Sequence, residues 1–387
     1  MSPVSNDWAL LGSIMKLNLT GYITGSTSYG LVTLNLMRSL MDLGVDVATH
    51  GISHNEEYGV YTPYVRKSAL QSKYFESEAP CLSVRHQFDM AQSIGCGTRI
   101  GYTFFEVNKL TPLELNHLKS LDKLIVPSKW AAQVCANSGL DTPEVCPAGY
   151  DETIFKPVNY MPPSCVFLSV GKWEVRKQQD AIVIAFHKAF TQSDNVKLWM
   201  SCNNKFIKDY VDQKKIKYKE YLGDKLTIID YIKEHSDLAR LMQQSYCFVA
   251  PSLAEGWNLP LLEAMACGKF NIATNYSAHT QFCNDESSIF IEPTGLVDAR
   301  DDMWFKEGNE TNNGQWCSYA EDDLISAMRL VYKHYQNNVV LNEDAAENAK
   351  RFTWKKSAEK MRSIIQDSQI SLITQRDQNM GLYDVKH

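Results

Sequence analysis

The sequence predicts an α/β protein made of two doubly wound, Rossmann-like domains that face a cleft, followed by a C-terminal helix. Three observations predict this fold. The chain has 387 residues, which exceeds what one hydrophobic core usually supports. Apolar strand-like runs alternate with segments of helical periodicity, first up to residue 157 and again from residue 165. A proline-rich stretch separates the two series, as expected for a linker.

The first domain is predicted over residues 15–157, and residues 1–14 are predicted to be an N-terminal extension outside the fold. A strand at 16–23 leads into a glycine-punctuated turn, and the apolar residues that follow recur at helical spacing. Further strands are predicted at 45–49, 81–84, 99–103 and 123–126. Two helix starts are visible, because Thr111 and Glu114 form a capping box and Ser128 can cap a later helix.

Residues 158–164 are predicted to be the linker, because the prolines around them disfavour regular structure. The second domain is predicted over residues 165–353 and repeats the alternation. Its strands are predicted at 166–170, 196–200, 226–229 and 246–250, and a helix at 179–190. The remaining residues, 354–387, are predicted to form a C-terminal helix and tail. In open parallel sheets ligands bind at the carboxyl ends of the strands, so functional residues are expected there.

Composition narrows the class of protein. With 44% hydrophobic and 22% charged residues the chain is of ordinary globular type. Its net charge of −6 argues against broad attraction to nucleic acid or to acidic membranes. Ten cysteines are scattered without a CxxC pair, which favours a reducing compartment. The N-terminal apolar run 8–15 is too short for an anchor and has no signal-peptide flank, so a cytoplasmic location is predicted.

The stretch most informative about function covers residues 248–268, which have the pattern of a strand, a polar loop and a short helix. A helix N-terminus that follows a strand presents unpaired N–H groups and a partial positive charge, which suits a diphosphate. Glu255 lies in the loop and Glu263 in the helix, with seven residues between them. The spacing alone is also compatible with a carboxylate at a solvated helix edge, because charged side chains are seldom fully buried.

A second group of charges follows the first strand of the second domain. In the segment SVGKWEVRK, Gly171 and Lys172 come directly after the strand and Lys177 follows five residues later. Two cations at the carboxyl end of a strand can neutralise a departing diphosphate, and no magnesium would then be needed. Taken alone, the two lysines can equally be ordinary exposed loop residues.

Together the two segments resemble the signature of glycosyltransferase family four, the retaining GT-B glycosyltransferases also called glycosyl transferases group one. In that signature two glutamates separated by seven residues bracket a glycine–aromatic–x–leucine–proline turn, here residues 256–260. The resemblance implies that Glu263 accepts hydrogen bonds from the donor's ribose and that Glu255 binds the transferred sugar. It implies that the distal phosphate is held by the backbone of Trp257, Asn258 and Leu259.

The resemblance covers roughly residues 16–368 and extends to the pair Lys172 and Lys177, beside Gly171. Two positions depart from the family pattern. Asn258 stands where glycine is usual, and Lys172 stands where arginine is more frequent, so that a point charge replaces a bidentate fork. The segment 298–316 looks like an insertion without an assigned role.

In the first domain the family resemblance directs attention to the turn that ends at Gly30, where glycine permits close approach of a ligand. His86, at the end of a predicted strand, is the candidate for contact with the transferred sugar, although an imidazole can equally serve a structural role. Glu106 also matches a family position near the cleft.

One feature favours DNA as the acceptor. Lysines interleaved with tyrosines in residues 205–221 can follow a phosphate backbone, although such a run is more often a solvated helix face.

The sequence therefore predicts a metal-independent, retaining glycosyltransferase that uses a nucleotide sugar, UDP- or GDP-linked, and an unidentified hydroxyl acceptor. Asp-x-Asp, a metal-binding triplet of the other common transferase fold, does not occur in the chain. The alternatives are transfer to a hydroxylated DNA base, a non-catalytic nucleotide-sugar-binding subunit and, more distantly, an isomerase of GT-B shape. Oligomeric state is left open.

Overall fold

The structure is a computed structural model that describes residues 14–51 and 58–383. Apart from Ile14, the predicted N-terminal extension lies outside the described residues. By its internal contacts the chain divides into two units. Unit 1 comprises the residues up to Thr103, Asn116–Ile125 and the chain from Trp354 onward, and unit 2 comprises Phe104–Leu115 and Val126–Thr353. The predicted domain boundaries and the linker at 158–164 remain predictions.

The first sheet has six strands in the order β2-β1-β3-β4-β5-β6. The pairs from β2 to β5 are parallel. Its strands are β1 (Lys16–Gly21), β2 (Asp46–Thr49), β3 (Cys81–Val84), β4 (Arg99–Tyr102), β5 (Lys123–Val126) and β6 (Glu144–Val145). The order changes direction between β1 and β3, and this switch point is where ligands bind in such sheets.

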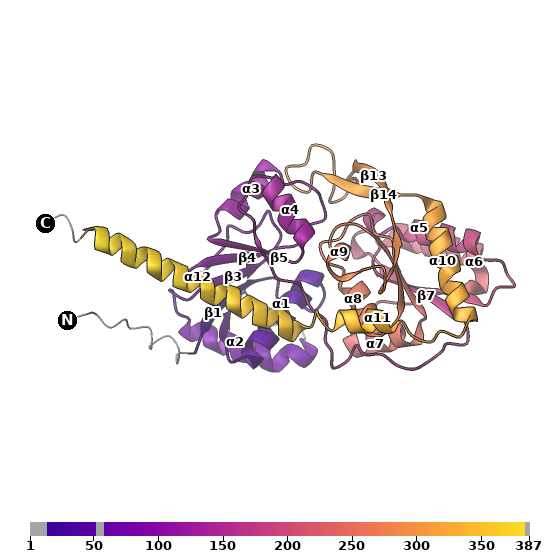
Figure 1. Ribbon diagram of the computed structural model, residues 1–387, viewed down its shortest axis with the longest axis horizontal. Helices are drawn as coiled ribbons and strands as arrows, with labels where there is room; N and C mark the ends of the chain where they lie inside the picture. The colour runs from indigo at the N-terminus through magenta and orange to yellow at the C-terminus, as the bar shows by residue number, and fades with distance from the viewer. Residues whose placement is uncertain (1–13, 52–57, 384–387) are drawn as a thin grey trace. The chain divides into compact units, whose positions relative to one another are not determined.

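Helices of the first half of the chain are α1 (Ser28–Asp42), α2 (Thr62–Gln71), α3 (Pro112–Lys119) and α4 (Lys129–Asn137), with 3₁₀ turns at Gly59–Tyr61 and Ser72–Tyr74. The long helix α12 (Trp354–Tyr383) packs along α1, as Figure 1 shows. The Arg362 guanidinium donates a 3.2 Å hydrogen bond to the carbonyl of Leu43 just beyond α1. The C-terminal helix therefore belongs by its contacts to unit 1.

The second sheet is parallel throughout and has the order β12-β11-β10-β7-β8-β9. Its strands are β7 (Cys165–Lys172), β8 (Val196–Asn203), β9 (Leu226–Ile228), β10 (Cys247–Ala250), β11 (Phe270–Thr274) and β12 (Ile289–Ile291). The order reverses between β7 and β10, so this pair forms the switch point.

Helices surround the second sheet, and a short antiparallel hairpin adjoins it (Figure 1). The helices are α5 (Gln179–Ala189), α6 (Lys208–Leu222), α7 (His235–Gln244), α8 (Leu259–Ala266), α9 (His279–Phe282), α10 (Glu321–Gln336) and α11 (Glu343–Ala349). The 3₁₀ turns are Val175–Lys177, Lys205–Ile207 and Gly223–Lys225, and the hairpin strands are β13 (Pro293–Asp298) and β14 (Gln315–Tyr319). A core of fully buried side chains, such as Phe167, Ile182 and Met328, lies between β7, α5 and α10.

The predicted fold class is confirmed, since both halves of the chain contain a helix-covered parallel sheet of the doubly wound type. The ends of some strands differ from prediction. The first strand ends at Gly21 instead of residue 23. Gly21 has φ 140°, and a Cβ there would lie 2.4 Å from the Val84 carbonyl oxygen, so the close approach of β3 requires glycine at this end of the strand.

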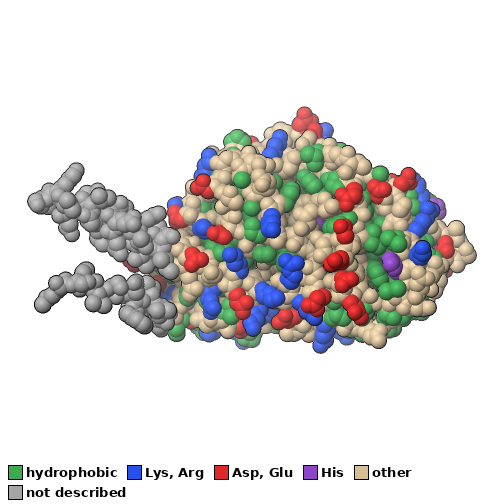
Figure 2. Space-filling model, viewed as in Figure 1, with side chains coloured by type: hydrophobic (Ala, Val, Ile, Leu, Met, Phe, Trp, Pro, Cys, Tyr) green, Lys and Arg blue, Asp and Glu red, His purple; other side chains and the backbone are tan. Residues whose placement is uncertain are grey.

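Surface charge follows the composition. Figure 2 shows basic and acidic side chains mixed over the face in view. Within the described residues no helix is long and apolar enough to cross a membrane.

Candidate functional site

The switch point of the second sheet brings the two predicted groups of charge together. Gly171 and Lys172 are the last residues of β7, and Glu255 follows β10 by five residues. Gly171 has φ 144°, a value that side chains rarely permit, and the aliphatic part of Lys177 lies beside it, 3.5 Å from where a Cβ would be. Glycine at this position is therefore explained by the backbone conformation.

Glu255 is buried and doubly ion-paired. Its carboxylate lies 2.6 Å from the Lys177 ammonium and 2.8 Å from the guanidinium of Arg176. Burial alone would raise the pKa of this carboxyl, but the two adjacent cations hold the pKa well below its ordinary value. The backbone N–H of Glu255 donates to the Ser277 hydroxyl at 2.8 Å. Glu255 is thus a fixed, ionised carboxylate.

Arg176 is a central residue of this site that the sequence did not single out. Its side chain is only 7% exposed. Besides Glu255 it contacts Glu174 at 2.9 Å and Glu106 at 3.8 Å, and it donates to the Ala254 carbonyl at 2.6 Å. Burial and the two neighbouring carboxylates, Glu255 and Glu174, raise the pKa of Glu106, while the guanidinium opposes that effect. The sequence offered one signal for Arg176, namely that it is a third cation in the segment that contains Lys172 and Lys177.

Lys172 completes the charge cluster from the other side. Its ammonium lies 2.7 Å from Glu174, and its side chain is 37% exposed. Lys172, Arg176 and Lys177 are therefore linked to one another through Glu174 and Glu255. Because a nucleotide diphosphate carries about two negative charges, cations at this strand end can attract it.

Glu263 lies on α8, and only 4% of its surface is exposed. Among the described residues its carboxylate has no hydrogen bond or ion pair. Burial, and secondarily the charge of Asp151, raise its pKa to about 8. Its burial contradicts the solvated-edge alternative for this glutamate. A buried carboxylate without a partner is costly, so it is a candidate for hydrogen bonds with a ligand.

Asn258 adopts a left-handed conformation with φ 86°, which glycine tolerates best and asparagine better than most residues. Its side-chain oxygen accepts from the Leu261 N–H at 3.4 Å and so caps α8. Its amide donates to His279 Nε2 at 2.9 Å. The other ring nitrogen of His279 faces the Thr274 carbonyl oxygen at 3.1 Å, which requires an Nδ1–H tautomer. The departure from glycine is therefore accommodated by a cap and a buried histidine.

The flanking residues of this turn have different surroundings. Trp257 is buried against Phe282, with ring centroids 4.9 Å apart, and against Phe352. Leu259 is the first residue of α8. The first N–H groups of a helix have no acceptor within it. The backbone of the turn, rather than the Trp257 side chain, is thus available to an anion.

The first-domain candidates lie at the switch point of the first sheet. Gly30 is in the first turn of α1, where a Cβ would be 2.0 Å from the Thr24 carbonyl oxygen. The glycine is therefore required by packing against the preceding turn. His86 follows β3, and its ring packs on Tyr29 at 4.3 Å and on Phe88 at 5.2 Å. The contact with Tyr29 brings His86 close to the turn of Gly30.

The lysine-rich run forms much of α6, and most of its cations are engaged within the same unit. Lys208 pairs with Asp212 and Lys214 with Asp180. Lys215 donates to Asn203 and Lys219 to the Leu226 carbonyl. These contacts favour the interpretation of a solvated helix face over that of a nucleic-acid groove.

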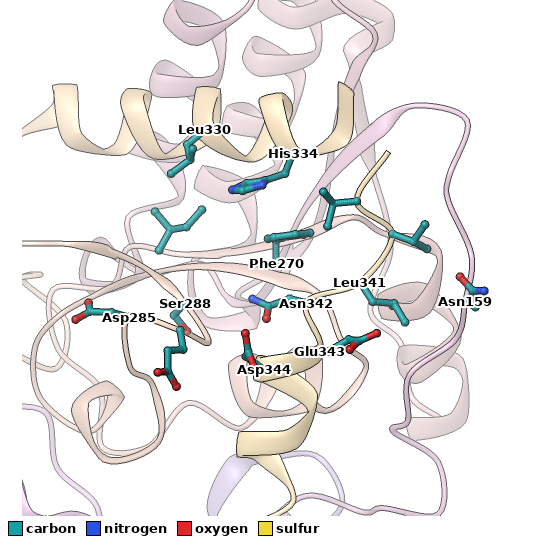
Figure 3. A pocket seen from close by; sticks show the side chains of 14 residues that line it. Asn159, Phe270, Asp285, Ser288, Leu330, His334, Leu341, Asn342, Glu343 and Asp344 are labelled. Atoms are coloured by element: carbon teal, nitrogen blue, oxygen red, sulfur yellow. The ribbon is translucent and has the colours of Figure 1, made fainter. Parts of the chain in front are cut away.

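One hollow in unit 2 lies away from the charge cluster (Figure 3). It has a volume of about 910 Å³, and in Figure 3 His334 stacks on Phe270 beside the aliphatic side chains. Its acidic lining residues are Asp285, Glu286, Glu343 and Asp344. Because the lining has four carboxylates and no lysine or arginine, it is unsuited to an anionic donor. In the described part of the chain no group of His, Cys, Asp and Glu side chains is arranged to hold a metal ion.

Comparison with known proteins agrees with this geometry. Residues 164–303 match the family model described as glycosyl transferases group 1. A comparison with curated protein sequences finds no match. Among solved structures, the sucrose-phosphate synthase of Thermosynechococcus elongatus aligns with a TM-score of 0.67 at 16% identity, over 91% of this chain and 98% of that one. Anabaena HepE in complex with UDP-glucose aligns with a TM-score of 0.67 at 12% identity, over 91% and 100%.

A glycosyltransferase from Rickettsia africae is similar over 92% of this chain and 99% of that one, with a TM-score of 0.62 at 12% identity. At these identities the structural neighbours establish the fold, and the family match covers a segment that contains Lys172, Lys177, Glu255 and Glu263. The chain accordingly has the GT-B fold, and its residues 164–303 match the family model of the glycosyl transferases group 1.

Proposed function

We propose that the chain is a retaining glycosyltransferase that moves a sugar from a nucleotide-diphosphate sugar to a hydroxyl acceptor without a metal ion. The observation that carries this proposal is the charge cluster at the switch point, where Arg176 and Lys177 pair with the buried carboxylate of Glu255 and Lys172 joins them through Glu174. The proposed donor is UDP- or GDP-linked, and HepE, a protein of similar fold, has been solved with UDP-glucose.

Each residue has a proposed role in binding the donor. Lys172 and Lys177 face the diphosphate, and the backbone of residues 257–259 at the start of α8 holds its distal phosphate. Glu263 accepts hydrogen bonds from the ribose, which would give its buried carboxylate the partners it lacks within the protein. Glu255 binds hydroxyls of the transferred sugar, and its ion pairs keep it ionised and oriented.

In the proposed reaction the bond between the sugar's anomeric carbon and the diphosphate oxygen breaks. The acceptor oxygen bonds to the same carbon on the same face, and the acceptor proton passes to the departing diphosphate. Lys172 and Lys177 stabilise the negative charge that develops on the leaving group. His86 and the turn of Gly30 are proposed to contribute from the first-domain side, His86 by contact with the transferred sugar.

A donor screen tests the proposal. Thermal shift with UDP, GDP and ADP and their common sugars identifies the nucleotide, and mass spectrometry follows transfer or hydrolysis. Glu255→Gln and Lys177→Gln are expected to lower turnover by about 100-fold or more, while Lys188→Gln, at an exposed pair with Glu321, leaves it unchanged. Activity is expected to persist in excess EDTA, and NMR is expected to show a product with the donor's anomeric configuration.

Several results would count against the proposal. An inverted product would refute retention, and loss of activity in EDTA that Mg²⁺ restores would refute metal independence. Binding of a nucleotide sugar without turnover of any donor would favour the non-catalytic subunit.

A further inference from the structure

The Lys172 ammonium lies beside two aromatic rings that contact each other, and one of these rings comes from the segment that the sequence identified as an insertion. Its ammonium is 5.2 Å from the ring centroid of Trp304 and 5.4 Å from that of Phe206. The two rings are nearly perpendicular, at 84°, with centroids 5.5 Å apart. A cation over an aromatic face is attracted by the ring's quadrupole.

Trp304 is held in place on a pre-organised turn. The Asp301 carboxylate accepts the backbone N–H groups of Met303, Trp304 and Phe305 at 2.8–2.9 Å. Phe305 next to it is buried against Trp316, with ring centroids 4.9 Å apart. The indole of Trp304 is nevertheless 43% exposed. Trp304 is therefore an exposed aromatic side chain on a fixed turn.

The backbone of Phe206 is also anchored by hydrogen bonds. Asn204 accepts the Phe206 N–H at 3.1 Å and donates to the Trp173 carbonyl at 2.8 Å. Phe206 is 57% exposed. The two rings beside Lys172 are therefore both solvent-exposed, and both belong to residues whose backbone is anchored by hydrogen bonds.

The two rings compensate for the lack of a fixed direction in a lysine side chain at this position. Arginine has a planar fork that fixes its direction on a phosphate, whereas lysine is a flexible point charge with freely rotating donors. Lys172 stands where the family that this chain resembles more often has arginine. Its partner Glu174 constrains it from one side only, and the two rings restrict the rest of its rotation.

We propose that Trp304 is a positioning residue, which together with Phe206 holds the Lys172 ammonium in place for the donor's diphosphate. This inference rests on the proposed function, because it assumes that Lys172 meets that diphosphate. Trp304 lies one residue beyond the last residue matched by the family model. The segment would thus supply a feature particular to this chain.

A double-mutant cycle on nucleotide binding tests the proposal. UDP, GDP and ADP are titrated calorimetrically into the full chain, and the tightest is used for all variants. Trp304→Ala is expected to weaken its binding about 3- to 10-fold. Trp304→Phe should remain within about 2-fold of the parent, and Trp304→Leu, which keeps apolar bulk without an aromatic face, should resemble alanine.

Two backgrounds at position 172 decide whether Trp304 acts through Lys172. In Lys172→Gln, which itself weakens binding, adding Trp304→Ala should change affinity by less than about 1.5-fold. In Lys172→Arg, which brings its own fork, Trp304→Ala should also have little effect. Tyr210→Ala is the matched control, since it removes an exposed ring 5.3 Å from a different lysine, Lys214. That control should leave binding unchanged.

The outcomes distinguish a failure of the positioning role of Trp304 from a failure of the proposed function. If Lys172→Gln weakens binding but Trp304→Ala has no effect, or has the same effect in both backgrounds, the positioning role is overturned and the proposed function stands. If no nucleotide binds, or Lys172→Gln binds like the parent, both are overturned. Circular dichroism and melting temperature of each variant report folding, and the Trp304→Leu variant replaces Trp304→Ala in both backgrounds if the alanine variant unfolds.

Discussion

Replacing Arg176 by methionine tests whether the buried charge cluster is organised as described. Methionine keeps much of the length but none of the charge, so the ionised Glu255, 5% exposed, loses one of its two cationic partners, the guanidinium at 2.8 Å. Glu174 keeps Lys172 but loses Arg176, and Glu106 loses its contact with Arg176. Removing one member of a buried ion pair typically costs about 3–5 kcal/mol. For a domain of this size that corresponds to a fall in Tm of about 6–20 °C.

The effect has a definite pH dependence. The pKa of Glu255 is held below its ordinary value of 4.5 in the folded protein, so the folded state binds fewer protons than the unfolded state as pH falls. The cluster's contribution is therefore fully present above about pH 5 and is lost as pH falls below the unfolded pKa. The difference in Tm between parent and Arg176→Met should shrink between pH 5 and pH 3.5.

Differential scanning calorimetry measures both quantities. Lys208→Met is the control, because Lys208 and Asp212 form an exposed pair and such pairs contribute little. A fall in Tm of less than about 2 °C for Arg176→Met, or a difference in Tm that grows on acidification, would contradict the described organisation of the charge cluster.

Three further substitutions have contrasting expected outcomes. Glu263→Gln should abolish nucleotide binding yet stabilise the protein by about 1–3 kcal/mol at pH 7 to 8. The reason is that burial raises the folded-state pKa of Glu263 to about 8, so the parent loses stability as pH rises from 4.5 to 8. Urea unfolding across that pH range measures this loss. Asn258→Ala should cost about 1–2 kcal/mol through the lost cap and the strained φ, and Asn258→Gly clearly less, measured by thermal unfolding. Gly30→Ala should lower stability by about 1–3 kcal/mol because its Cβ meets the Thr24 carbonyl, and unchanged stability with weakened nucleotide binding would instead indicate a ligand contact.

Elements whose signals lie within a few residues could be predicted from the sequence. Strands 81–84 and 123–126 match β3 and β5 residue for residue. The capping box at α3 forms in both directions, with the Thr111 N–H donating to Glu114 at 2.8 Å and the Glu114 N–H donating to Thr111 at 3.3 Å. Ser128 accepts the Ala131 N–H at the start of α4. Each of these depends on local spacing alone.

Some elements without a regular apolar pattern were not predicted. Strand β11 contains Asn271, which is fully buried and breaks the apolar run that marks a central strand. Its side-chain NH₂ donates to the Lys269 carbonyl at 2.6 Å, whereas its buried Oδ1 has no hydrogen-bond partner among the described residues. The hairpin of β13 and β14 is one more case, because its exposed strand Pro293–Asp298 has no buried face to give an alternating pattern.

The candidate site shows the same limit. The motif spacing identified Lys172, Lys177, Glu255 and Glu263, but it could not distinguish a solvated glutamate from the buried one at position 263. Arg176 escaped notice because arginine next to lysine in a loop is usually exposed. Its burial depends on Glu255 and Ala254, which follow a different strand.

The balance of charge in the cluster leads to a final prediction, that donor binding takes up protons. Lys172, Arg176 and Lys177 face three carboxylates, Glu174, Glu255 and Glu106. A diphosphate would add negative charge to a cluster that already contains as many carboxylates as cations. Glu106 is the weakest acid of the three carboxyls, since burial raises its pKa whereas the pKa values of Glu174 and Glu255 are lowered. It should therefore gain a proton when an anion arrives. Calorimetric titration of the nucleotide in buffers of different ionisation enthalpy measures that uptake at pH 6 to 7. Glu106→Gln should reduce it, and equal uptake in parent and variant would assign the proton to another group.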